Sequence, residues 1–137
     1  DDKDNSEYFI YKYNISNENK KRIRFLSNIY SKNLDKIFFE EKNLWKILYF
    51  NGKDYLIDLI DFKIFQNKKL DKNLVKLKAF FSNQESPKLD IKAKTLIEKF
   101  NYKEGKELGL KLKEIEEFWI ENSFKISDQE LKKLIKN

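Results

Sequence analysis

Apolar residues recur at helical spacing along nearly the whole chain, and this pattern constrains the fold more than any other feature. No long stretch alternates apolar and polar residues as a half-buried strand would. Pro87 is the only proline, so little interrupts the helical pattern. The sequence therefore predicts an all-α protein, an irregular helical array of about seven helices in two sub-bundles.

Local signals place the ends of these helices. Ser16 and the polar residues after it can cap the first helix, and Asn51-Gly52 predicts a helix stop followed by a turn. Ser127 and Glu130 have the spacing of a capping box, in which each side chain bonds the backbone amide of the other residue. The expected helices span about residues 20–31, 34–51, 53–66, 71–82, 90–100, 104–124 and 127–136.

The polar stretch 82–87 is the most loop-like part of the chain and predicts a boundary. We expect a helical body region at 1–84 and a smaller helical tail subdomain at 85–137. Within the body, an N-terminal arm at about 1–15 is predicted to be extended or strand-like. It contains a dense aromatic run that either stacks against a partner or packs against other protein: Tyr8, Phe9, Tyr11 and Tyr13.

The residue inventory excludes much chemistry. The chain has no cysteine and no histidine, which removes disulfides, thiol catalysis, the usual zinc sites and histidine acid-base catalysis. Asp58 and Asp61 are three apart and could face a metal together, but they alternate with an apolar stripe and fit a solvated helix face better. We expect no catalytic residue, no metal site and no bound cofactor in this chain.

No run of 18 apolar residues occurs, and the acidic N-terminus does not resemble a signal peptide. These features predict a soluble, cytoplasmic protein without a membrane partner. The chain also contains no methionine, which suits a segment excised from a longer protein.

The net charge of +6 and the pI near 9.2 are compatible with a polyanionic partner such as nucleic acid. Only Arg22 and Arg24 are arginines, however, and the chain is rich in Lys, Asn, Ile and Phe. An AT-rich genome encodes these residues often in any protein, so the lysines are also compatible with an ordinary solvated surface. Charge alone leaves both interpretations open until the lysines are shown to cluster.

A set of motifs in the last third of the chain is more specific. Residues 105–109 read Gly-Lys-Glu-Leu-Gly at a helix start, Leu96-Ile97 is an apolar pair, and Trp119-Ile120 is followed by Phe124. With these motifs, the stretch 87–127 resembles the tail of bacterial tRNA nucleotidyltransferases, the CCA-adding enzymes, whose superfamily includes bacterial poly(A) polymerases. The chain departs from the family pattern at four places: Ala93 and Thr95 replace a Gly and an Asp, Asn101 replaces a turn glycine, and the helix start lacks a proline.

The resemblance implies that the chain is the body and tail of such an enzyme. In that family these parts hold tRNA at its acceptor stem and at the elbow of the T arm. The resemblance assigns catalysis, Mg²⁺ and CTP or ATP to an N-terminal head and neck of the same protein. We therefore expect the parent to be a CCA-adding enzyme or a poly(A) polymerase, and this chain alone to be inactive.

Holding a double-stranded stem requires phosphate contacts and recognition of shape, which lysines can provide. Gly105 at the helix mouth is expected either to let a phosphate backbone approach or to allow close helix packing, and Gly109 to allow packing. The alternative from another class is a helical protein-interaction module with solvated lysines. The candidate RNA contacts are Lys88, Lys92, Lys94, Lys99, Lys103, Gly105 and Lys106, with a second basic run at Lys68, Lys69, Lys72 and Lys76.

Overall fold

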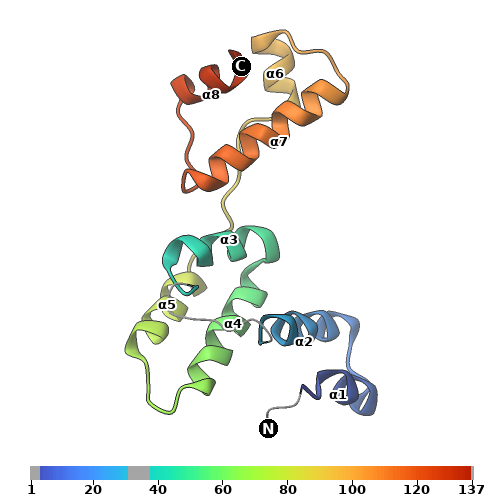
Figure 1. The fold of residues 1–137 in the computed structure, drawn as a ribbon, viewed down its shortest axis with the longest axis vertical. Helices are drawn as coiled ribbons and strands as arrows, with labels where there is room; N and C mark the ends of the chain where they lie inside the picture. Colours follow the sequence, from blue (N-terminus) through green and yellow to red (C-terminus); the bar gives the residue numbers. More distant parts are fainter. Residues whose placement is uncertain (1–3, 31–37, 137) are drawn as a thin grey trace. The chain divides into compact units, whose positions relative to one another are not determined.

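The computed structural model describes residues 4–30 and 38–136, and the regular structure within these ranges is entirely helical (Figure 1). The predicted all-α class is confirmed, with eight helices in the described ranges where about seven were expected. They are α1 (Ser6–Tyr13), α2 (Asn17–Tyr30), α3 (Glu41–Asn51), α4 (Lys53–Gln66), α5 (Lys72–Ser82), α6 (Ala93–Phe100), α7 (Lys106–Glu121) and α8 (Asp128–Lys136).

The chain divides into two compact units, Asp1–Ser86 and Pro87–Asn137, here called the body unit and the tail unit. In the body unit, α4 packs against α2, α3 and α5. Its Leu56, Leu59 and Ile60 side chains are fully buried. Burial of one such side chain contributes about 1.5–3 kcal/mol, so α4 supplies much of the body core.

The junction of α3 and α4 follows the predicted stop signal. Gly52 is the single residue between the two helices, and its φ of 92° lies in a region that suits glycine. Trp45 is half-buried and packs edge-on against Phe80 and Phe81. The helix expected at 34–51 is shorter in the described part of the chain, because residues 38–40 form a turn before α3 begins at Glu41. Its predicted apolar positions 34 and 37 lie outside the described residues.

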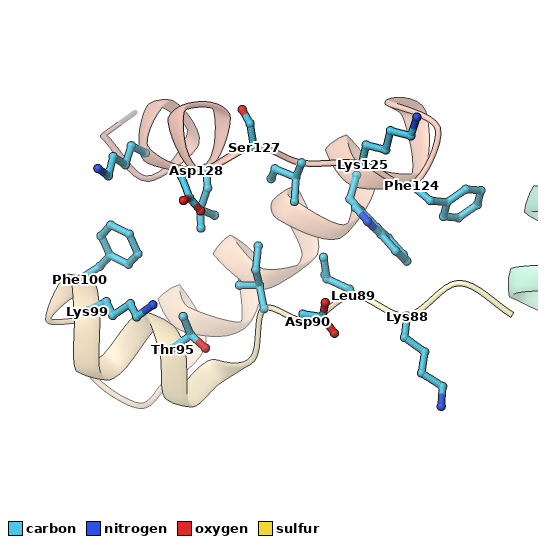
Figure 2. Close-up of a pocket in the computed structure, with 15 residues that line it drawn as sticks. Lys88, Leu89, Asp90, Thr95, Lys99, Phe100, Phe124, Lys125, Ser127 and Asp128 are labelled. Atoms are coloured by element: carbon cyan, nitrogen blue, oxygen red, sulfur yellow. The ribbon is translucent and has the colours of Figure 1, made fainter. Parts of the chain in front are cut away.

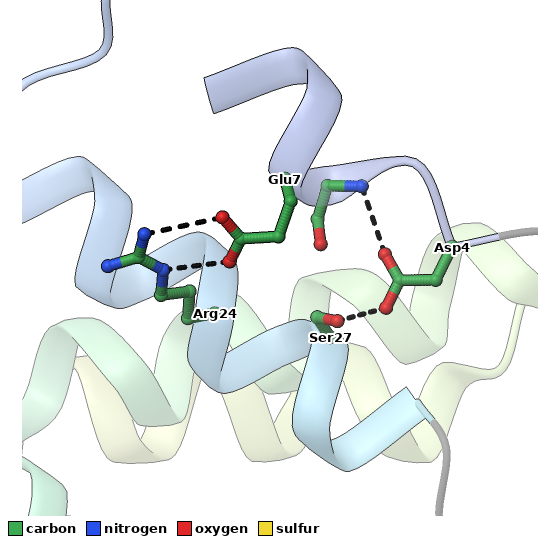
Figure 3. A network of polar contacts seen from close by, with 5 residues as sticks. Asp4, Glu7, Arg24 and Ser27 are labelled. Atoms are coloured by element: carbon green, nitrogen blue, oxygen red, sulfur yellow. Dashed lines mark hydrogen bonds and ion pairs between the residues drawn. The ribbon is translucent and has the colours of Figure 1, made fainter. Parts of the chain in front are cut away.

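The prediction of an extended N-terminal arm is wrong, because residues 6–13 form helix α1. The Asp4 carboxylate accepts a hydrogen bond from the Ser6 amide at 3.0 Å and another from the Ser27 hydroxyl (Figure 3). Arg24 donates from Nε and Nη2 to the two carboxylate oxygens of Glu7, at 2.9 and 3.3 Å. These contacts with α2 stabilise a short helix that would be marginal alone.

The carboxylates of α4 also differ from the prediction. Asp58 accepts two hydrogen bonds from Arg22 of α2, both at 2.7 Å, and Asp61 pairs with Lys78 of α5 at 2.7 Å. Both carboxylates are partly buried and join neighbouring helices, so they do not form a solvated face. The apolar stripe was correct, but α4 packs against three helices, and its Asp58 and Asp61 side chains face two of them.

In the tail unit, α7 packs against both α6 and α8 around the buried side chains of Leu96, Leu108, Ile115 and Leu131. Trp119 is also buried. The capping box of α8 is confirmed, because the Ser127 amide donates to Glu130 Oε2 at 2.8 Å and the Glu130 amide donates to Ser127 Oγ at 3.2 Å.

The two glycines of the tail unit differ in backbone conformation. Gly105 precedes α7 with a φ of 143°, a conformation that L side chains rarely adopt, so the backbone itself requires glycine there. Gly109 is exposed, and a Cβ built on it would meet nothing within 4 Å. The prediction that Gly109 permits close helix packing is therefore wrong, because no described atom of the tail unit, apart from those of adjoining residues in α7, lies within 4 Å of that Cβ position.

Candidate nucleic-acid interface

A groove of about 720 Å³ runs through the tail unit between two walls (Figure 2). Residues 88–91 and α6 form one wall, and residues 124–127 with α8 form the other. Here this feature is called the tail groove. Its lining is Lys88, Leu89, Asp90, Ile91, Thr95, Lys99, Phe100, Trp119, Phe124, Lys125, Ile126, Ser127, Asp128, Leu131 and Lys132.

The segment after Pro87 is extended, and its side chains alternate between two environments. Leu89 and Ile91 pack against the tail core, whereas Lys88 and Asp90 are exposed at the groove. Because the apolar pair fixes which side faces inward, the sequence Lys-Leu-Asp-Ile places one cation and one carboxylate on the same outer side.

Helical spacing positions most of the other polar groups. Thr95 and Lys99 are four apart on α6 and share a face, while Leu96 between them is fully buried. Asp128 and Lys132 have the same spacing on α8, beside the buried Leu131. Each wall therefore has one helical lysine that lines the groove, Lys99 on α6 and Lys132 on α8, and a buried leucine anchors each helix in the core.

The turn that ends α7 contains two non-glycine residues in the left-handed region, Ser123 with φ 57° and Phe124 with φ 60°. Such a φ is unfavourable for a bulky residue such as Phe124. It is held by a hydrogen bond of 2.8 Å from the Phe124 amide to the Trp119 carbonyl and by edge-on contact of the two rings. This turn reverses the chain and brings Lys125 to the groove.

The charges of the groove are not neutralised within it. The lining contains four lysines and two carboxylates, an excess of positive charge. Among the described residues, none of these six groups has an ion-pair or hydrogen-bond partner. By contrast, Lys111 of α7 forms an intrahelical ion pair with Glu114 at 2.9 Å. The groove lysines are thus free to meet an external anion.

The predicted tail lysines separate into three groups. Lys88 and Lys99 meet at the tail groove, as described. Lys92 and Lys94 are exposed and do not line it, and Lys94 pairs loosely with Glu98 at 3.8 Å. The third group consists of Lys103, Gly105 and Lys106, which line a second hollow of about 580 Å³ together with Glu104 and Glu107.

In that second hollow two carboxylates balance two lysines, so it attracts a phosphate less than the tail groove does. The positive φ of Gly105 is itself a reason for a glycine at this position, so no ligand is needed to explain it. The basic run of the body unit lines a shallow hollow of about 540 Å³ at residues 67–73, which contains Lys68, Lys69 and Lys72. Lys76 follows on exposed α5, and Asp71 is occupied in capping that helix.

Sequence reasoning missed Lys125 and Lys132, as well as the groove carboxylates Asp90 and Asp128. The two lysines lie more than 25 positions beyond Lys99. A helical projection of the last helix could have found Lys132, because it lies one turn after Asp128 and beside the apolar stripe. No local sequence pattern identifies Lys125, because its position at the groove depends on the strained turn at Ser123 and Phe124.

No group of three or more Asp or Glu side chains lies close enough to hold a metal ion in residues 4–30 and 38–136. Within those ranges, no helix combines the length and the apolar character needed to cross a bilayer. Comparison of the chain with protein-family models, curated proteins and solved structures gave no match.

Proposed function

We propose that this chain is the tRNA-docking part of a tRNA nucleotidyltransferase. In this proposal it holds the acceptor stem and the T-arm elbow while a head elsewhere in the same protein extends the 3′ end. The observation that carries the proposal is the tail groove, where four lysines without partners among the described residues gather from distant parts of the tail.

A groove of this kind suits one strand of a duplex. Lysines neutralise phosphates without fixed geometry, which gives affinity for a backbone of any sequence. An RNA duplex is recognised mainly by shape and by its backbone, and this is what an acceptor stem of variable sequence demands. The apolar floor of Leu89, Ile91 and Leu131 is anchored in the tail core, so the lysine positions are set by a packed scaffold.

The arginines support backbone recognition over base reading. Arginine is the side chain that most often reads guanine through two parallel hydrogen bonds. Both arginines of this chain are engaged elsewhere, Arg22 with Asp58 and Arg24 with Glu7. The body lysines at 68, 69 and 72 would provide a second backbone contact in the body unit. Nucleotide transfer, with Mg²⁺ and CTP or ATP, belongs in this proposal to the head and neck.

One observation favours the alternative of a protein-interaction module. Helix α1 buries only Ile10 and leaves four aromatic side chains accessible, of which Tyr11 is 86% exposed. Aromatic residues are enriched at protein interfaces. In the proposed enzyme this face would contact the head or neck of the same protein; in the alternative it would contact a separate partner.

The experiment measures binding by fluorescence anisotropy at low salt, using a labelled RNA hairpin that contains an acceptor stem and T arm. The comparison ligand is an unstructured single-stranded RNA with the same number of phosphates. We expect tighter binding of the hairpin and, with CTP, ATP and Mg²⁺ added, no incorporation of nucleotide. Equal affinity for the two RNAs would refute tRNA docking, because charge alone would then explain binding.

A further inference from the structure

The tail groove contains two carboxylates that phosphate binding does not explain. Asp90 lies on one wall and Asp128 on the other (Figure 2). Neither has a hydrogen-bond or ion-pair partner among the described residues, although four lysines line the same groove. In the body unit, by contrast, Asp58 and Asp61 each pair with a cation of a neighbouring helix.

A carboxylate beside a bound phosphate repels it, and the repulsion grows as water leaves the groove. An ionised carboxylate can only accept hydrogen bonds. In a sugar-phosphate backbone, the group able to donate one is the ribose 2′-hydroxyl, which RNA has and DNA lacks. Hydrogen bonds from a hydroxyl to a carboxylate are short and about twice as strong as neutral ones.

We infer that Asp90 and Asp128 accept hydrogen bonds from ribose 2′-hydroxyls of the bound strand, so that the tail groove selects RNA over DNA. This inference rests on the proposed function. Lysines toward the two ends of the groove, Lys88 at one and Lys99 at the other, bind phosphates, and the carboxylates of Asp90 and Asp128 lie along the groove between them (Figure 2). The exposed hydroxyl side of Thr95 lies on the same wall as Asp90 and offers a neutral acceptor.

The two carboxylates both favour binding of RNA and disfavour binding of DNA. With RNA they gain two charge-assisted hydrogen bonds, whereas with DNA they keep their repulsion for phosphate and remain unpaired. Leaving a charged group desolvated and without a partner is costly, so rejection of DNA exceeds the simple loss of contacts. Lysines alone would bind both duplexes through the same phosphates.

The test uses the full chain and three duplexes of one sequence: RNA, DNA, and RNA with every 2′-hydroxyl methylated. The methylated duplex keeps the ribose conformation but has no 2′ donor, so it separates shape from hydrogen bonding. We expect RNA to bind about a hundredfold more tightly than methylated RNA, because two hydrogen bonds to charged groups are lost and each corresponds to about tenfold in affinity.

The variants are Asp90→Ala, Asp128→Ala and the double variant, with Glu117→Ala as a control for an exposed carboxylate of the tail unit outside the groove. In the double variant, we expect RNA and methylated RNA to bind within about twofold of each other, and DNA to bind more tightly than it does to the unchanged chain. Asp90 precedes α6, and its side chain makes no hydrogen bond or ion pair with the described residues, so its single variant tests the inference without touching α8.

The possible failures can be told apart. If the unchanged chain binds none of the three duplexes, the proposed function fails. If it binds RNA and methylated RNA equally, RNA docking stands and the 2′-hydroxyl inference is overturned. An RNA preference that persists in the double variant also overturns the inference, because the preference would then come from other groups.

Discussion

Removal of two groove lysines tests whether the tail groove binds phosphates. The perturbation is Lys99→Ala together with Lys132→Ala, which takes one cation from each wall. Both residues are exposed on helices, where alanine is at least as favourable as lysine, so the fold is expected to persist. The matched control is Lys113→Ala with Lys133→Ala, two exposed helical lysines of the same unit that do not line the groove.

The magnitude follows from counterion release. Each phosphate neutralised on a duplex contributes about −0.9 to the slope of log K against log salt, so four groove lysines contribute about −3.6. Raising the salt from about 50 to 200 mM would weaken binding about 150-fold through these contacts. For the double variant the groove contributes about −1.8, which corresponds to a loss of about 12-fold over the same range.

The assay is a set of anisotropy titrations with the acceptor-stem hairpin at five salt concentrations for the unchanged chain, the groove variant and the control. Contacts made by body lysines add equally to all three slopes, so the difference reports the groove alone. We expect the groove variant to be less steep by about 1.8 and the control to be unchanged. Equal slopes for the groove and control variants would refute phosphate binding in the groove.

Three further predictions concern the fold. Gly109→Ala is expected to raise the free energy of unfolding by about 0.5–1 kcal/mol, because alanine is the better helix former and its Cβ meets open space. Gly105→Ala is expected to lower it by about 1–3 kcal/mol, because alanine is strained at this positive φ. Thermal unfolding followed by circular dichroism checks both. Asp58→Ala leaves Arg22 unpaired and is expected to cost about 1 kcal/mol in urea unfolding, and no change would contradict a contribution from this pair. The pKa of Glu7 lies below its ordinary value because Arg24 donates hydrogen bonds to it, so the docking of α1 is stabilised above pH 4.5 and lost as the pH falls through the lowered pKa; tyrosine resonances of α1 that do not change on acidification would contradict this.

The helical architecture could be predicted because its signals are local. The spacing of apolar residues gave 53–66 for α4 with the observed bounds, and Ser127 with Glu130 gave the start of α8. Helix α1 could not be predicted in the same way. It is only eight residues long, and its support comes from Arg24 and Ser27, which lie far along the chain on α2.

The candidate site was only partly predictable for the same reason. Lys88 and Lys99 lie near the recognised motifs, so sequence reasoning selected them. Lys125 reaches the groove because of the turn at Ser123 and Phe124. Both residues have the left-handed conformation, and neither is a glycine, so no signal in the sequence indicates this turn. The sequence also treated lysine density as the signal, although pairing decides which cations are free, as Lys94 and Lys111 illustrate.

The most direct test of RNA docking in the tail groove is a map of backbone amide resonances during titration with the acceptor-stem hairpin. The proposal predicts that the largest shifts fall on residues 88–91, on Thr95 and Lys99, and on residues 124–132, with small effects at Lys113. Shifts concentrated on α1, or distributed over all exposed lysines alike, would contradict it.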